Sequence, residues 1–254
     1  MSPGMRRVVA PVVGIVVFGL LWEALVRTFD IRRFVLLPPS AVINTFLDDP
    51  AFYWDNAVTT TRHMVVGMSI ALVCAVVVGS FMAASRFVEE ATQPVLILFL
   101  VTPWVAYITS VVLWLNGGDP TIYFMVAFTS FSVFTFGVVG GMKSADPAAR
   151  ELLASVNARP WEVLWRLRLP AALPSIFTTA RFAVGLGLAA AYFSEGSALT
   201  TDGLGAIGRR ASSFNDAEVL WTTIVCAALL GIFGLVVVSL LERILLRWHV
   251  SQRS

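Results

Sequence analysis

The chain has few residues that could carry out chemistry, and none of them is arranged for catalysis. Its two histidines, His63 and His249, have no metal-ligating or nucleophilic partner nearby, and its two cysteines lack a CxxC spacing. The nearest approach to a phosphate-binding loop is the segment GVVGGMKS at 137–144, in which Met142 stands where the glycine before the lysine is required. We therefore expect no catalytic residue, no metal site and no ATP hydrolysis by this chain.

A second kind of chemistry is suggested by ionisable residues within apolar stretches. Glu195 lies at the end of one such stretch, and Arg181 lies about one turn into the same stretch. An ionisable side chain inside a membrane commonly marks a path for solutes, unless it pairs locally. For Glu195 two interpretations stay open: a pathway or gate residue, or an interfacial carboxylate bonded to Ser194, Ser197 or loop backbone. For Arg181 we favour pairing, or extension of the side chain to the membrane interface.

The elements that position these residues are predicted to be transmembrane helices. Hydrophobic residues make up 57% of the 254 positions and charged residues only 13%, too few to cover a soluble domain. The apolar residues come in blocks of about 20, the length that crosses a bilayer as a helix. We predict an all-α membrane protein with one transmembrane domain over residues 1–254 and spans at about 8–26, 61–85, 94–115, 121–142, 176–195 and 219–241.

The distribution of basic residues predicts the orientation. If the N-terminus is inside, 11 basic residues lie on the inner side and 6 on the outer side, so both termini are expected in the cytoplasm. The net charge of +2 is too small to favour nucleic-acid binding.

The most informative connection is the predicted cytoplasmic loop at 143–175. Asp146-Pro147 can cap and begin a helix, Asn157 to Pro160 would break it, and Pro160 can begin a second helix. We expect Pro170 and Pro174 to end that second helix. The result is a helix hairpin with one apolar side and several arginines, suited to docking on a partner protein or to lying on anionic lipid.

The loop resembles the EAA motif of permease subunits in binding-protein-dependent ABC importers. Glu151 takes the place of the glutamate, leucines 152 and 153 stand at the two alanines, Asn157 stands at the glycine, and Leu169-Pro170 stands at the end. Asparagine is the non-glycine residue that most readily adopts the left-handed backbone of a turn. By this resemblance, contact with an ATPase would be made by Glu151, Leu152, Leu153, Val156, Asn157, Ala158, Trp161, Leu169 and Pro170.

Further segments resemble the nitrate, sulfonate and taurine subfamily of these permeases. They are Leu37-Pro38-Pro39-Ser40, Pro103 to Ala106, Pro170 to Pro174 with Arg181 beyond it, Glu195 with Gly203-Leu204-Gly205, and Trp248. The resemblance implies a type I importer fold in a bacterial plasma membrane and a path for a small polar solute, either of this subfamily or a pyrimidine precursor. It also implies three partners: ABC ATPase subunits that bind ATP and Mg, a second permease (identical or different), and an extracytoplasmic solute-binding protein.

Two other classes of protein remain to be weighed. An ATPase-independent secondary transporter or channel would call for a charge relay in mid-membrane or an inverted repeat, and a membrane-embedded enzyme would call for a catalytic set. Neither pattern is present in the sequence. Candidate pathway or gate residues are Trp104, Tyr107, Thr109 and Glu195, because polar side chains in spans can line a path or bond to neighbouring helices.

Overall fold

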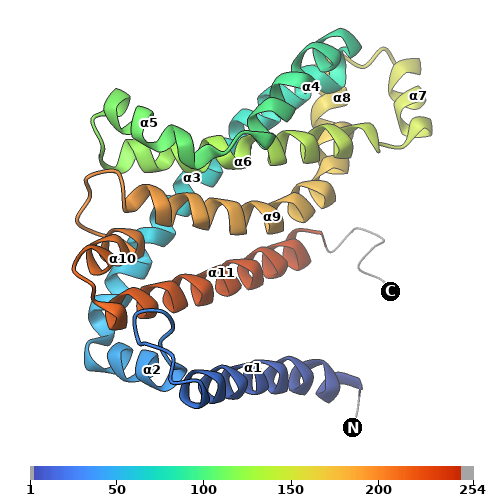
Figure 1. The fold of residues 1–254 in the computed structure, drawn as a ribbon. Coiled ribbons are helices and arrows are strands. Elements are labelled where there is room, and N and C mark those ends of the chain that lie inside the picture. The colour runs from blue at the N-terminus through green and yellow to red at the C-terminus, as the bar shows by residue number, and fades with distance from the viewer. Residues whose placement is uncertain (1–2, 247–254) are drawn as a thin grey trace.

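The computed structural model describes residues 3–246, and every regular element within that range is helical (Figure 1). In chain order the elements are α1 (Pro3–Thr28), α2 (Pro39–Asp48), α3 (Pro50–Ala84), α4 (Arg86–Val101), η1 (Trp104–Tyr107), α5 (Ile108–Leu115), α6 (Gly118–Lys143), α7 (Pro147–Ser155), α8 (Pro160–Val163), η2 (Leu164–Arg168), α9 (Leu169–Glu195), α10 (Leu204–Ser213) and α11 (Ala217–Leu245). Trp248, part of the expected sequence pattern, lies outside the described residues.

Five described helices are long and apolar enough to span a membrane, and a bent pair makes a sixth candidate. The all-α class and the number of spans are therefore as predicted. The second span is longer than expected, because α3 begins at Pro50 and not at 61. Asp49 caps it by accepting a hydrogen bond from the Phe52 N–H, and its 35 residues extend for about 52 Å, well beyond the hydrocarbon core.

The third span is not the single helix that was predicted. Helix α4 ends at Val101, and the segment Trp104–Leu115 leaves it at an angle of 87°. The break falls at Thr102-Pro103, where Thr102 is extended with φ −75° and ψ 133°. Proline disfavours helical backbone in the residue before it, which explains why the helix ends here.

The prediction that Pro170 and Pro174 end the helix after the loop is also wrong. The chain is helical from Pro160 to Glu195. A single π-turn, η2, precedes Pro170, and in it the Leu169 N–H donates to the Leu164 carbonyl. The wide turn shifts the hydrogen-bond register just before the proline, so that the missing N–H of Pro170 is accommodated at the start of α9. Pro174 lies inside α9.

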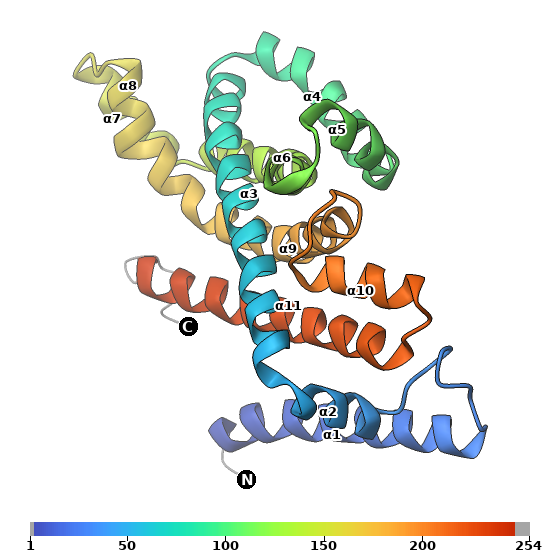
Figure 2. The ribbon, with the colours of Figure 1, turned by 90° about the vertical axis from the view of Figure 1, so that its left-hand side faces the viewer.

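The core of the molecule is α6, which packs between α3 and α9. Buried residues from the three helices meet there, among them Ala75 of α3, Val138 of α6 and Ala172 of α9. A Cβ at Gly141 would lie only 2.7 Å from the Cα of Ala172, so α6 and α9 approach closely because this residue is glycine. Figure 2 shows α6, α9 and α11 in succession along the length of α3.

The two ends of the helix bundle carry different elements. Helices α7 and α8, the start of α1 and the end of α11 lie at one end, here called the hairpin end (Figure 1). Helices α2, α5 and α10 gather at the opposite end. Helix α1 stands apart from the bundle, with 6% of its apolar span buried. Its contacts with the rest include the Trp22 ring, which lies 6.2 Å from that of Trp221, and Glu23, which accepts from the Ser40 N–H of α2.

Candidate functional site

The loop at the hairpin end forms the two-helix turn that its sequence indicates. The Asp146 side chain accepts a hydrogen bond from the Ala148 N–H and caps α7. Asn157 stands at the turn with φ +50°, in the left-handed region that asparagine tolerates. Glu162 then accepts from the Arg159 N–H at 2.9 Å and fixes the start of α8. Residues 146–163 are called the hairpin below.

The hairpin presents large apolar side chains to its surroundings. Leu152, Val156 and Trp161 are 66%, 67% and 64% exposed. Trp165, one turn beyond, is 53% exposed, and its ring lies 5.2 Å from that of Trp161. These four side chains, three on the hairpin and Trp165 in the π-turn just beyond it, are called the apolar face below. Exposed clusters of this kind, bordered by charge, mark interaction surfaces.

The other residues of the predicted contact set take different positions. Glu151 and Asn157 are exposed on the hairpin, while Leu153 and Ala158 are partly buried. Leu169 and Pro170 do not belong to the hairpin, because they lie at the start of α9, beyond the π-turn.

Polar contacts fasten the base of the hairpin to the bundle. The Arg168 guanidinium donates to the Ala83 carbonyl at 3.0 Å, which ties the π-turn to the end of α3. Lys143, the last residue of α6, forms an ion pair with Glu89 of α4. The two contacts therefore connect the π-turn to α3, and the end of α6 to α4.

At the opposite end, Glu195 closes the same continuous helix in a buried polar cluster. Glu195 is 1% exposed and accepts two hydrogen bonds, from Thr60 Oγ1 at 3.0 Å and the Gly205 N–H at 2.9 Å, and its second oxygen lies 2.8 Å from His63 Nδ1. Thr60 in turn accepts from the Leu204 N–H at 2.9 Å. The carboxylate thus bonds backbone beyond its own helix, at Gly205 in the first turn of α10, and not Ser194 or Ser197.

The cluster continues through the second ring nitrogen of His63. Nε2 lies 3.2 Å from Oδ1 of Asp119, the acidic residue in the first turn of α6. Asp119 also accepts from Arg62 at 2.8 Å and from the Tyr123 hydroxyl at 3.3 Å. Thr60, His63, Asp119, Glu195 and the N–H groups of Leu204 and Gly205 are called the Glu195 cluster below.

His63 and Asp119 were not singled out from the sequence as a pair. A signal for one of them was present: Asn56, Thr60 and His63 follow at i, i+4 and i+7, which places a polar stripe on one face of α3. Asn56, the first residue of this stripe, also bonds the segment before α10, because its side-chain oxygen accepts from the Gly203 N–H at 2.8 Å. Nothing in the local pattern around Asp119 connects it to this stripe.

The remaining pathway candidates lie at the break in the third span. The Trp104 ring packs 5.9 Å from Phe193 of α9, and the Tyr107 ring packs 5.7 Å from Phe128 of α6. Thr109 is exposed on α5. Trp104 thus packs against α9 at Phe193, two residues before Glu195, whereas the Glu195 side chain lies in the buried Glu195 cluster. Arg181, at the other end of α9, is paired with Glu242 of α11.

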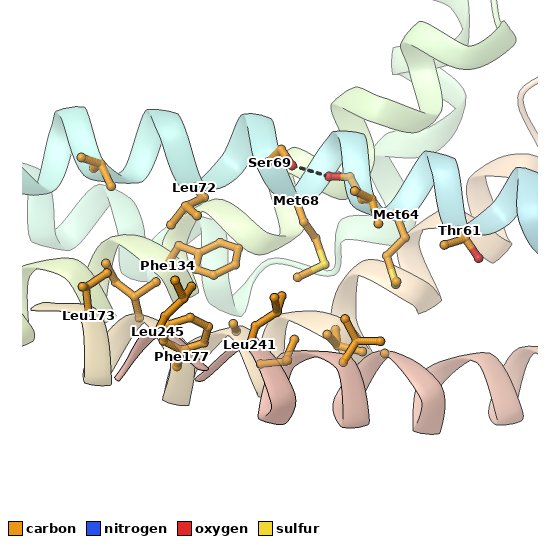
Figure 3. Close-up of a pocket in the computed structure, with 18 of the residues that line it drawn as sticks. Thr61, Met64, Met68, Ser69, Leu72, Phe134, Leu173, Phe177, Leu241 and Leu245 are labelled. Atoms are coloured by element: carbon orange, nitrogen blue, oxygen red, sulfur yellow. Dashed lines mark hydrogen bonds between the residues drawn. The ribbon is translucent and has the colours of Figure 1, made fainter. Parts of the chain in front are cut away.

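An apolar cavity of about 780 Å³ lies between α3, α9 and α11 (Figure 3). Its lining includes Met68, Leu72, Phe134 and Phe177. The Ser69 hydroxyl donates to the Val65 carbonyl of its own helix, at 2.7 Å. A polar solute would lose its hydration there with little to replace it. The cavity is therefore suited to acyl chains or an apolar helix.

Comparison with known proteins identifies the type of protein to which these elements belong. The sequence model of the family "Binding-protein-dependent transport system inner membrane component" matches residues 75–249. The chain is 26% identical to the formylaminopyrimidine transport permease protein ThiX of Halalkalibacterium halodurans, over 92% of this chain and 93% of that protein. It is 25% identical to the taurine transport system permease protein TauC of Escherichia coli K12, over 97% and 92% of the two chains.

The fold has a counterpart among solved structures. An inward-facing structure of the MetNI methionine ABC transporter contains a chain that superposes with a TM-score of 0.53 at 16% identity, covering 74% of this chain and 93% of that one. The expected type I importer fold agrees with this match. From the family match and the relatives together, we conclude that the chain belongs to the binding-protein-dependent transport system inner membrane components and is a permease subunit of an ABC importer of the sulfonate, nitrate and taurine type.

Proposed function

We propose that the hairpin docks on a separate ATPase subunit and that the helix from Pro160 to Glu195 carries the resulting motion across the membrane. One observation carries the proposal: the 36 residues from the hairpin to the Glu195 cluster are a single helical path. At about 1.5 Å per residue it is roughly 54 Å long, enough to cross the whole bilayer. A displacement of Trp161 at one end therefore reaches Glu195 through hydrogen-bonded backbone.

A protein partner fits the hairpin better than a lipid surface does. The apolar face includes two tryptophans in edge-to-face contact, and aromatic residues of this kind dominate protein interfaces. Arg150, Arg159 and Arg166 are exposed nearby, and Glu151 adds an acidic group to the same segment. A mixed charge pattern around aromatic anchors is typical of the rim of a protein interface.

The proposed contact set is the one that the EAA-like motif implies: Glu151, Leu152, Leu153, Val156, Asn157, Ala158 and Trp161 on the hairpin, with Leu169 and Pro170 at the start of α9. The hairpin would then face the cytoplasm, as would both termini, in agreement with the excess of basic residues on that side. ATP and Mg would be bound by the ATPase subunit, because this chain has no phosphate-binding loop of its own.

The same proposal extends to the other partners and to the cargo. Relatives named for taurine and formylaminopyrimidine transport suggest a small polar solute, delivered by an extracytoplasmic binding protein. A second permease subunit, identical or different, would complete the path. Trp104, Tyr107 and Thr109 are the proposed path residues, and Glu195 is proposed to act in the gate through the segments that it holds.

The experiment is co-purification of the tagged chain from its native host in mild detergent. A P-loop ATPase should be recovered with the wild-type chain and lost with Glu151→Arg and with a deletion of residues 151–169. Glu218→Arg, a reversal of an exposed carboxylate at the opposite end, is the matched control and should retain the ATPase. Recovery of the same amount of ATPase with the deletion would refute the docking role of the hairpin. A second permease in the preparation would distinguish a heteromeric from a homomeric pair.

A further inference from the structure

The hydrogen bonds of the Glu195 cluster converge on one buried carboxyl group. Thr60 accepts from Leu204, so its own hydroxyl hydrogen is directed to Oε2 of Glu195. The Gly205 N–H is a second donor to Oε2. With two donors Oε2 is an acceptor only, and the remaining oxygen, Oε1, lies 2.8 Å from His63 Nδ1.

His63 faces a carboxylate oxygen with each of its ring nitrogens, at 2.8 Å on the Glu195 side and 3.2 Å on the Asp119 side. Neutral imidazole has one N–H, so one nitrogen would then turn a lone pair toward a carboxylate. Only the imidazolium donates to both. Asp119 also pairs with Arg62, so the 1% exposed Glu195 belongs to a connected network of polar and charged groups, as burial of a carboxyl group requires.

We propose that His63 and Asp119 are positioning residues of the transport cycle. The His63 imidazolium holds Glu195 against the first N–H groups of α10 and joins it to Asp119 of α6, so that α3 around His63 and the adjoining ends of α6, α9 and α10 move together, as a unit called the latch below. Each bond in the chain from Asp119 to His63, Glu195 and Gly205 is present in the structure. Glu195 also lies at the N-terminus of α10, where a negative charge is favoured.

The latch depends on pH in a defined direction. When the ring carries an N–H on each nitrogen, both bridging bonds are made; removal of one of these protons leaves a lone pair facing a carboxylate oxygen. The groups that face His63 are Glu195 of α9, Asp119 and Tyr123 of α6, and, through Asp119, Arg62 of α3. Helix α10 contributes backbone N–H groups alone to the described bonds. Asp119 is 41% exposed, which gives protons access.

The consequence for transport rests on the proposed function, but the latch can be tested without it. Thermal unfolding of the full-length chain, purified in detergent, is followed from about pH 5.5 to about pH 9 for the wild type, His63→Gln and Asp119→Asn. The wild-type Tm should fall by roughly 5–10 °C across this range, and both variants should start lower and show a flat profile. Arg33→Gln, which breaks an exposed ion pair with Glu218 at the same end, should keep the wild-type slope.

Two further outcomes make the test decisive. In the double variant the loss of Tm should be well below the sum of the two single losses, because both break the same chain of bonds. The proposal would be overturned if His63→Gln and Asp119→Asn gave pH profiles of Tm parallel to that of the wild type. It would also be overturned if the Tm losses of the two single variants added up in the double variant. If His63→Gln does not fold, Asp119→Asn carries the same test from the exposed side of the cluster. In the complex with its ATPase, both variants should change the pH profile of ATP hydrolysis yet still retain the ATPase, whereas failure of hairpin docking would abolish that retention.

Discussion

Replacement of Trp161 by alanine should weaken binding of the ATPase subunit while leaving the chain folded. The side chain is 64% exposed in the free chain, so little packing within the chain is lost. A tryptophan can bury about 150–250 Å², so docking would remove roughly 100–160 Å² of this one from water. At about 25 cal/mol per Å² this amounts to about 3 kcal/mol, or on the order of 100-fold in Kd.

The assay is binding of the co-purified ATPase to the permease in nanodiscs, with the Tm of the permease measured in parallel. Phe214→Ala is the matched control, because Phe214 is 78% exposed at the opposite end of the molecule. It should leave the Kd for the ATPase unchanged. If the Kd of Trp161→Ala for the ATPase were within about twofold of the wild-type Kd, the apolar face would not be the contact surface.

Three further predictions follow from particular backbone and charge positions. Asn157→Val places a β-branched residue at φ +50° and should cost about 1–2 kcal/mol, seen as faster hydrogen exchange in the hairpin, whereas Asn157→Gly should not. Gly205→Ala would set a Cβ 1.8 Å from a carbonyl oxygen of α9 and should abolish the folded peak in fluorescence-detected size exclusion, while Gly185→Ala, with nothing within 4 Å, should retain it. Glu89→Lys should lower the Tm by about 2–4 °C by opposing Lys143, and adding Lys143→Glu should restore it; equal melting of the single and double variants would count against a contribution from this pair.

Features governed by local chemistry could be predicted from the sequence. The spans follow from the length of the apolar blocks, since a helix is the only way for a lone segment to satisfy its backbone in lipid. The hairpin was likewise predictable, because the Asp146 cap, the turn at Asn157 and the start at Pro160 are each determined within a few residues. The conformation of Asn157 at φ +50° agrees with the tolerance that was expected of asparagine at this turn.

Prolines showed the limit of such local rules. Pro103 breaks its span and leaves the two halves at 87°, whereas the chain stays helical through Pro170 and Pro174. A proline removes one N–H in every case, and the outcome depends on whether the neighbouring turn can change its hydrogen-bond register. The π-turn before Pro170 does so, and it is held in place by the contact of Arg168 with the end of α3. That contact joins residues 85 positions apart and has no trace in the local sequence.

Glu195 illustrates the same division between sequence and tertiary structure. Its residue type and place at the end of an apolar block were enough to make it a candidate, because an ionisable group in a span requires a reason. Its partners come from α3, α6 and α10, and only the packing of these helices brings His63 and Asp119 into one line with it. Sequence alone therefore determined which residues would be costly to bury. Tertiary structure decided how that cost is met, since hydrogen bonds act over about 3 Å in space regardless of separation along the chain.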